Sequence, residues 1–346
     1  MEKDFFPENQ ADKKGIFRHD LKVVFNLRSF FLAEPLKDEL RGRLSWRIQS
    51  LFKDPEMLLS EFFETVYSPL RLLNRSPRTK VLFHYTIRLF SQTLGRPAEL
   101  SDLSDLSVAR HLERLIAQGR APAGVNKERR QLIALWNLAA RKRLVEDFPQ
   151  VSTVREPERL PEAWSLEELW RLRIACNMEP GTIAGIPAGR WWTALHLVLY
   201  STGERVSAVL ESRWRDISGA SIVFPADSRK GKRKPLLASL SHEAVEALER
   251  IRTPERELVF PWDLSKTYLY TRYRKILLRA ELDDSRRSKF HRLRKSHATH
   301  LKAAGGDPTA SLGHSSAETT ARYLDPRFLP SRVAELLPSF DPKVNP

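Results

Sequence analysis

The second half of the chain contains six residues that together could cut a phosphodiester bond without a metal ion. Such chemistry needs a nucleophile, cationic groups that stabilise the charge of the transition state, and an acid for the leaving oxygen. The residues that supply these groups are Arg205, Lys230, His291, Arg294, His314 and Tyr323. The sequence shows no DxD or HExxH motif and no carboxylate cluster suited to Mg²⁺ or Zn²⁺, so the set is consistent with metal-free chemistry.

Arg205 closes the phrase Thr202-Gly-Glu-Arg, directly after an apolar segment. An arginine at a helix start that emerges from buried sequence is poorly placed for a solvated charge, and it could clamp a phosphate in bidentate fashion. The alternative is a structural arginine with a salt bridge to Glu211 or Asp216.

Five of the six residues from Arg229 to Lys234 are basic, and Gly231 marks a turn between two predicted strands. A basic hairpin tip is well shaped to reach into a groove or along a nucleic-acid backbone. An ordinary charged turn is the alternative, but these charges would repel one another without an anion nearby. The residues predicted to contact DNA are Arg229, Lys232, Arg233, Lys234 and Arg292.

His291 and Arg294 are three residues apart, so both would lie on one face at the start of a helix. On a phosphate, the arginine would neutralise charge and the histidine would donate a hydrogen bond or a proton. His297 and His300 have the same spacing and could instead bind a metal. No carboxylate or cysteine ligand is nearby, which favours packing or capping within the helix.

Tyr323 lies nine residues after His314, which belongs to the phrase Leu312-Gly-His-Ser-Ser. A single tyrosine is most often a core or interface residue, and a single histidine is usually structural. Only the combination with the basic residues upstream indicates chemistry.

Composition supports a polyanionic partner. The formal net charge is +15 and the pI is about 10.0, as is typical of nucleic-acid-binding proteins. Cys176 is the single cysteine, which excludes an intrachain disulfide and favours a reducing, intracellular location. We expect the protein in the cytoplasm, associated with the nucleoid. We expect no signal peptide after Met1, and the longest apolar stretch, near Trp191–Tyr200, is too short to span a bilayer.

The elements that position these residues fall into several regions. Residues 1–54 form an N-terminal extension without an assigned role, and 55–150 read as a helical DNA-binding domain with arginine-rich exposed positions. Helical periodicity and breakers predict helices at Pro55–Tyr67, Arg78–Leu94, Ser107–Gln118 and Asn126–Lys142. A Pro-rich, charged linker over 151–162 leads to a catalytic domain over 163–346.

The catalytic domain is predicted to be mixed α+β, and the chain as a whole mainly α with a small antiparallel β-sheet. Ser165 with Glu168 forms a capping box at the start of its first helix. Strands are expected at Ser221–Pro225 and Pro235–Leu240. Helices are expected at Trp191–Tyr200, Gly203–Glu211, Ser241–Arg250, Lys266–Arg279, Leu293–Ala304 and Ala317–Tyr323.

The ordered set of six residues resembles the catalytic signature of the tyrosine recombinases, the phage-integrase, Xer and Cre group. Three phrases carry the resemblance: the arginine box Ser201–Asp216, the second box His291–Leu301, and the C-terminal box Leu312–Ser316 with Thr319–Tyr323. The resemblance covers about 163–326 strongly. Residues 55–150 match the helical, SAM-like core-binding domain of the family only in general character.

The resemblance implies a role for each residue. Tyr323 would attack the scissile phosphate and form a 3′-phosphotyrosyl link, while Arg205 and Arg294 would clamp the non-bridging oxygens. Lys230 would be the general acid for the 5′-oxygen. His291 would assist proton transfer at Tyr323, and His314 would form a hydrogen bond to the phosphate. Lys232 is the alternative general acid; Lys230 precedes the turn glycine, as in related hairpins. Rejoining would need neither ATP nor any cofactor.

Two departures from the family pattern stand out. The connection between Arg294 and His314 is shorter than usual, and Glu204 occupies a position that is often apolar. A type IB topoisomerase uses a similar set but usually has lysine at the position of His291, which favours a recombinase. A DNA-binding protein of the same fold that no longer cuts is the other alternative.

The resemblance also implies partners. These are double-stranded DNA and further copies of the chain, as a homotetramer on paired recombination sites and a monomer or dimer off DNA, with no membrane. In the family a C-terminal helix is usually exchanged between protomers, and Ser331–Leu337 is the candidate segment here. The target sequence, and whether the reaction is integration, excision, resolution or transposition, cannot be predicted from the residues.

Overall fold

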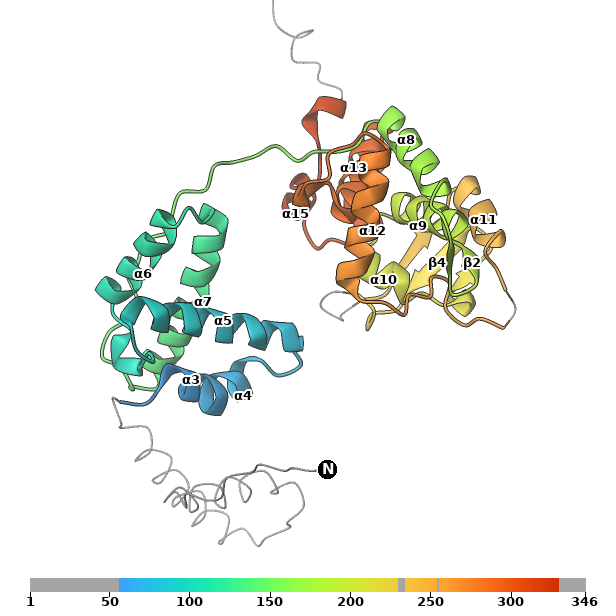
Figure 1. The fold of residues 1–346 in the computed structure, drawn as a ribbon. Coiled ribbons are helices and arrows are strands. Elements are labelled where there is room, and N and C mark those ends of the chain that lie inside the picture. Colours follow the sequence, from blue (N-terminus) through green and yellow to red (C-terminus); the bar gives the residue numbers. More distant parts are fainter. Residues whose placement is uncertain (1–55, 230–233, 254, 330–346) are drawn as a thin grey trace, which may run out of the picture. The chain divides into compact units, whose positions relative to one another are not determined.

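The computed structural model describes residues 56–229, 234–253 and 255–329 (Figure 1). The chain divides into two compact units between Pro157 and Glu158, inside the Pro-rich segment 151–162.

The first unit is built from helices whose ends follow local sequence signals. Pro77 and Pro122 are the first residues of their helices, where a missing N–H costs nothing. Ser104 caps the helix that begins at Asp105 by accepting a hydrogen bond from the backbone N–H of Ser107. Gly95, with φ of 76°, ends the helix that begins at Pro77. The helices are α3 (Leu59–Phe62), a π-helix (Phe63–Tyr67), α4 (Ser68–Arg71), α5 (Pro77–Leu94), α6 (Asp105–Ala117) and α7 (Pro122–Arg141), with a 3₁₀ turn at Leu100–Asp102.

The first predicted helix, Pro55–Tyr67, was expected to end before Ser68-Pro69, but the helix does not stop there. The helical run continues to Arg71 because a wide π-helical turn over Phe63–Tyr67 comes directly before the proline. A proline ring normally clashes with the carbonyl four residues earlier, and a wider turn relieves that contact.

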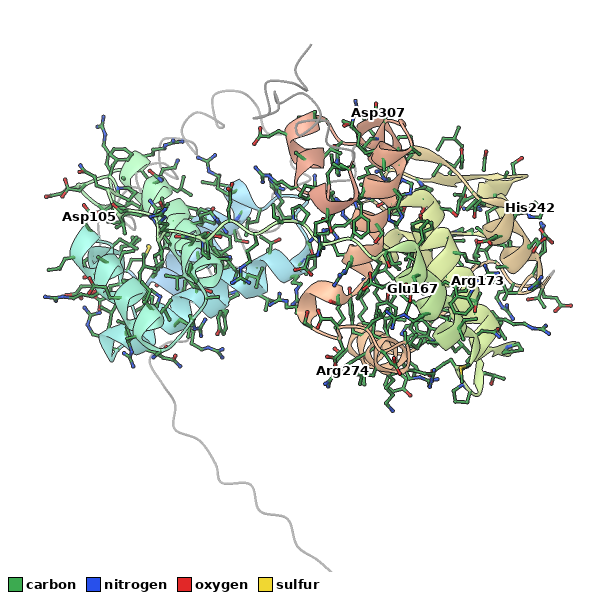
Figure 2. The ribbon with its side chains drawn as sticks, turned by 90° about the horizontal axis from the view of Figure 1, so that it is seen from above. Asp105, Glu167, Arg173, His242, Arg274 and Asp307 are labelled. Atoms are coloured by element: carbon green, nitrogen blue, oxygen red, sulfur yellow. The ribbon has the colours of Figure 1, made fainter. Side chains whose placement is uncertain are left out.

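The core of the first unit is aromatic and aliphatic, with Phe63, Phe90, Leu132 and Trp136 almost fully buried. Asp105 at the start of α6, labelled in Figure 2, accepts a hydrogen bond of 2.8 Å from the backbone N–H of Gln150. The surface is basic, as expected from the sequence: the exposed arginines include Arg71, Arg75, Arg78, Arg88, Arg96 and Arg130.

The second unit is a helical assembly around α9. Its helices are α8 (Leu166–Asn177), α9 (Ala188–Thr202), α10 (Val206–Leu210), α11 (His242–Glu249), α12 (Lys266–Arg279), α13 (Phe290–Ala303), α14 (Pro308–Leu312) and α15 (Ala317–Ala321), with 3₁₀ turns at Trp214–Asp216, Arg286–Ser288 and Pro326–Phe328. The capping box of Ser165 with Glu168 at the start of α8 is confirmed.

Two small antiparallel sheets complete this unit. The strands β1 (Thr182–Ile183) and β2 (Ile186–Pro187) form one, and β3 (Ile217–Ser218), β4 (Ser221–Phe224) and β5 (Leu236–Ser239) form the other in that order. In the predicted pair β4–β5, Val223 is opposite Leu237. The predicted class, mainly α with a small antiparallel sheet, is confirmed; the two-residue strands β1, β2 and β3 were not predicted, because they are too short to show alternation.

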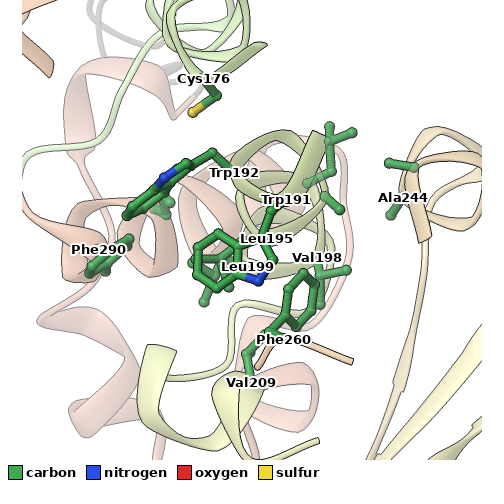
Figure 3. Close-up of a cluster of buried hydrophobic side chains, with 14 of the residues drawn as sticks. Cys176, Trp191, Trp192, Leu195, Val198, Leu199, Val209, Ala244, Phe260 and Phe290 are labelled. Carbon is green, nitrogen blue, oxygen red and sulfur yellow. The ribbon is translucent and has the colours of Figure 1, made fainter. Parts of the chain in front are cut away.

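The apolar helix α9 forms the centre of the second unit, where it packs against α8, α11 and α13 (Figures 1 and 3). Trp191 and Trp192 are almost fully buried, and their rings lie 5.0 Å apart, edge to face. Cys176 of α8 is buried in the same core. Burial of side chains of this size contributes about 2 to 3 kcal/mol each, so α9 fixes the frame on which the functional residues are placed.

Several helix boundaries in this unit differ from the prediction: α9 begins at Ala188 rather than Trp191, and α15 ends at Ala321, before Tyr323. Helix α13 begins at Phe290, three residues before the predicted start at Leu293. This start was not predicted because the N-cap residue, Lys289, makes no side-chain capping bond and is not a typical capping residue. The short helix α14 lies in a segment predicted as a connection. Asp307, labelled in Figure 2, caps α14 by accepting a hydrogen bond from the backbone N–H of Thr309.

Candidate active site

Five of the six predicted residues come together in the second unit, namely Arg205, His291, Arg294, His314 and Tyr323. The sixth, Lys230, lies outside the described residues, and so does its alternative Lys232. The assignment of a lysine as the general acid for the 5′-oxygen therefore stays a prediction.

A glycine places Arg205. Gly203 ends α9 with φ of 61°, and a Cβ at this position would lie 2.5 Å from Cδ2 of His297 and 2.7 Å from Cδ2 of Leu312. Both the conformation and the close approach demand glycine. The turn makes Arg205 the N-cap residue of α10, with 30% of its side chain exposed. In the described part of the chain its ion-pair partner is Glu204, at 3.6 Å, not Glu211 or Asp216.

Arg294 is the most deeply buried of the five predicted residues, with 1% of its side chain exposed. Its Nη1 donates a hydrogen bond of 2.7 Å to the backbone carbonyl of Gly203, and its guanidinium carbon lies 5.4 Å from the centre of the Tyr323 ring. Burial and the nearby Arg205 lower the pKa of Arg294, whereas Glu204 raises it. Arginine nevertheless stays charged at any physiological pH.

His314 follows α14 and is held in one tautomer. Its Nε2 lies 2.9 Å from Nη2 of Arg294, which can only donate, so Nε2 is the acceptor. Its Nδ1 then carries the proton and donates to the hydroxyl of Thr320, 3.0 Å away. Burial, with the positive charges of Arg294 and Arg205, lowers the pKa of His314 to about 4, so the ring is neutral in the free protein.

Tyr323 lies among the rings and charges of the other residues. The centre of its ring is 5.1 Å from that of His291 on α13 and 5.0 Å from that of His314. Its backbone carbonyl accepts a hydrogen bond from the hydroxyl of Thr299, which in turn accepts one from the backbone N–H of Asp325. The tyrosine is therefore fixed by its backbone as well as by its neighbours.

Two arginines predicted to contact DNA are instead bound within the protein. The side chain of Arg229 is 9% exposed and donates hydrogen bonds to Glu204 and to the backbone carbonyls of Lys234 and Leu312. Arg292 is 8% exposed, and its guanidinium carbon lies 3.6 Å from the centre of the Trp164 ring. Their burial argues against direct DNA contacts by these two side chains.

The remaining residues predicted to bind DNA are placed differently. Lys234 is exposed. Lys232 and Arg233 lie outside the described residues, so their predicted contacts are neither supported nor contradicted.

His297 and His300 connect helices. Nδ1 and Nε2 of His297 lie 2.8 Å from the carbonyl of Tyr200 and the hydroxyl of Ser311, and Nδ1 of His300 lies 2.8 Å from the Tyr200 hydroxyl. Among the described residues, no group of three or more His, Cys, Asp or Glu side chains could hold a metal ion.

Sequence reasoning missed two contributors to the site. Glu204 was noted only as a departure from the family pattern, although a carboxylate next to Arg205 in apolar sequence was the available signal. Thr320, which orients His314, offered no signal, because its contact arises from the packing of α15 beside the end of α14.

The comparisons with known proteins agree with this architecture. Residues 181–329 match the model of the phage integrase family. The fold is similar to a lambda integrase dimer bound to a COC′ core site, with TM-score 0.62, 17% identity, and 91% of this chain and 88% of that chain covered. It is also similar to the Tn1549 transposon integrase in complex with a circular intermediate DNA, with TM-score 0.63, 13% identity, and 78% of this chain and 95% of that chain covered.

A third similar structure is the XerH site-specific recombinase bound to a palindromic difH substrate, with TM-score 0.56, 17% identity, and 72% of this chain and 77% of that chain covered. A search of curated proteins found no match. The second unit has the fold of an integrase catalytic domain, and the first unit is a separate helical unit. The second unit therefore contains a phage integrase family domain, over residues 181–329. In the described part of the chain no helix is long and apolar enough to cross a membrane.

Proposed function

We propose that this protein is a site-specific DNA recombinase that cuts and rejoins DNA through a covalent link to Tyr323. The observation that carries the proposal is that Tyr323 lies together with two arginines and two histidines in one site, which extends from the buried Arg294 to the exposed His291. Each group that metal-free phosphodiester chemistry needs, apart from the acid for the leaving oxygen, has a candidate among the described residues.

In the proposed reaction the Tyr323 hydroxyl oxygen attacks phosphorus and loses its proton, with His291 as the assisting group. A bond forms between phosphorus and the tyrosine oxygen, and the bond from phosphorus to the 5′-oxygen breaks. The 5′-oxygen takes a proton from a general acid, for which Lys230 is the proposed residue. The product is a 3′-phosphotyrosyl link, and a 5′-hydroxyl reverses the same steps to rejoin the strand without ATP.

Arg205 and Arg294 would stabilise the negative charge that develops on the non-bridging oxygens. Donors that are already oriented in a dry site cost no reorganisation during the reaction, and losing one of them typically slows such steps by about 10²–10³-fold. His314 accepts from Arg294 in the free protein, so its Nε2 must gain a proton before it can donate to a phosphate.

The first unit offers a basic surface for the DNA backbone. Three cations surround Tyr85: Arg88, Arg120 and Lys127 lie 5.3, 5.7 and 5.7 Å from its ring centre. Such a concentration of positive charge is suited to phosphates. The proposed partners are double-stranded DNA and three further copies of the chain on paired sites. Ser331–Leu337, the candidate exchanged helix, lies outside the described residues.

The test is a suicide DNA substrate, in which a nick lets the cleaved 5′-end diffuse away and traps the covalent intermediate. DNA flanking the gene, searched for inverted repeats, supplies the substrates. We expect a protein–DNA adduct on a denaturing gel with the wild-type protein and none with Tyr323→Phe. Binding without an adduct would instead support the catalytically silent DNA-binding protein, and relaxation of supercoiled DNA without strand exchange would support the topoisomerase.

A further inference from the structure

A fully buried carboxylate lies among the arginines of the candidate site. The side chain of Glu204 is 0% exposed, yet no sequence argument requires an acid at this position. Burying an isolated charge is costly, so a carboxylate persists in such a place only when cations and hydrogen bonds compensate it.

Three arginines compensate Glu204. Its Oε2 accepts a hydrogen bond of 2.8 Å from Nε of Arg229. Its Oε1 lies 3.6 Å from Nη1 of Arg205 and 3.6 Å from Nη1 of Arg294. Oε1 also accepts a hydrogen bond of 2.7 Å from the backbone N–H of Arg205. One carboxylate is therefore the common partner of both predicted phosphate-clamping residues.

The carboxylate is itself firmly oriented. The backbone N–H of Glu204 donates to the hydroxyl of Thr202, which donates in turn to the backbone carbonyl of Val198 in α9. Arg229 completes the frame, because it also binds the backbone carbonyls of Lys234 and Leu312. Gly313 leaves room for this guanidinium, since a Cβ there would lie 3.0 Å from Nη2 of Arg229.

The charges of this group suit a transition state better than a bound substrate. Three guanidinium groups and one carboxylate leave a net charge of +2. A phosphodiester carries one negative charge, and its five-coordinate transition state gains a second when the nucleophile has lost its proton. Without the carboxylate, the surplus charge would favour tight binding of the ground state, which does not accelerate the chemical step.

We propose that Glu204 is a positioning residue of the reaction, which holds Arg205 and Arg294 at the spacing of one phosphate and balances the charge of these two arginines and of Arg229. This role rests on the proposed function. Glu204 would act without contacting the DNA, through Arg205 and Arg294, the two predicted phosphate-clamping residues.

The test compares Glu204→Gln with Glu179→Gln, a matched control in the same unit. Glu179 is also buried, with 3% of its side chain exposed, and it accepts hydrogen bonds of 2.7 and 2.8 Å from Arg272 and Arg279. Both substitutions remove one buried charge from between arginines, but the control lies at the end of α8, against α12. The measurements are the melting temperature, the equilibrium Kd for the suicide substrate and the single-turnover rate of adduct formation.

For Glu204→Gln we expect a rate of adduct formation at least tenfold below wild type, with Kd unchanged or lower. For Glu179→Gln we expect a rate within twofold of wild type despite a similar loss of melting temperature. A wild-type rate for Glu204→Gln, or an equal rate loss in both variants, would overturn the proposal. A Glu204→Gln variant whose Kd rises in step with its rate loss would also overturn it.

Glu204→Asp keeps the charge and shortens its reach, so it tests the spacing if the glutamine variant does not fold. We expect a slower rate of adduct formation at unchanged Kd, and an unchanged rate would count against the proposal. Wild-type protein that forms no adduct would overturn the proposed function and this role with it. If the wild type and the Glu204 variants form the adduct at equal rates, only the role of Glu204 would be overturned.

Discussion

The floor of the candidate site, formed by Glu204, Arg294 and His314, differs from its rim, formed by Arg205, His291 and Tyr323. Floor side chains are bound to the protein through their charged or polar atoms, as where Arg294 donates to the carbonyl of Gly203. The rim is more accessible: His291 is exposed, and so is 30% of the Arg205 side chain.

This difference separates two tasks. The floor is organised before any ligand arrives, because its hydrogen bonds already fix the guanidinium of Arg294 and the tautomer of His314. The rim presents the groups that meet the substrate. Substitutions in the floor should therefore alter folding stability and chemistry together, whereas substitutions in the rim should alter chemistry alone.

The largest effect is expected for a rim residue, Tyr323→Phe. The ring contacts with His291 and His314 remain, so the free energy of unfolding should change by less than about 1 kcal/mol. Adduct formation should disappear, because no other hydroxyl takes the place of the nucleophile. The suicide-substrate assay and thermal unfolding measure the two quantities. Residual adduct in this variant would place the nucleophile elsewhere.

The two arginines give the sharpest contrast between floor and rim. Arg294→Ala and Arg205→Ala should both slow adduct formation by about 100-fold or more. Only Arg294→Ala should also cost about 3 kcal/mol of stability, since it leaves Glu204 buried with one cation fewer. Arg205→Ala should cost less than about 1 kcal/mol, as is usual for a partly exposed ion pair. Denaturant unfolding distinguishes them, and equal stability losses would abolish the distinction.

His314 gives the floor a dependence on pH. Its pKa in the folded protein is about 4, below the ordinary value of 6.5, so the unfolded chain binds this proton more readily. The stability that the neutral ring contributes is complete above pH 6.5 and is lost as pH falls toward 4. A bound phosphate should raise the pKa of His314, so that DNA binding takes up a proton and strengthens as pH falls. NMR titration of the ring with and without DNA measures this; an unchanged pKa in the complex would show that the phosphate does not reach the floor.

The smallest effects are expected outside the site, at two basic residues with opposite exposure. Lys234→Ala should lower the slope of log Kd against log salt by about 1, because an exposed lysine on the basic run can neutralise one phosphate. Arg292→Ala should leave that slope unchanged and cost about 1 to 2 kcal/mol of stability, through its lost contact with Trp164. A reduced slope for Arg292→Ala would restore it as a DNA contact.

Local features were predictable from the sequence, and tertiary ones were not. The helix Lys266–Arg279 matches its prediction at both ends, because Ser265 caps it and its apolar spacing is regular. The order of the candidate residues was equally visible. The burial of Arg229 and Arg292 was not, since a charged side chain becomes internal only when distant segments supply its partners.

The short helix α14 had a signal that was overlooked. Asp307 followed by Pro308 is a common start of a helix, with a capping acid and a proline in the first position. With only five residues, the helix shows no periodicity. Its left-handed end at Gly313 brings His314 to Arg294.

Cys176 has a practical consequence. It is fully buried, and burial raises the pKa of its thiol, so it is a poor nucleophile and a poor target for alkylation. Because the sequence contains no other cysteine, the native protein offers a silent background for thiol labelling. A spectroscopic probe on a cysteine introduced in each unit would therefore report the distance between the units, in the free protein and on DNA, without first removing a native thiol.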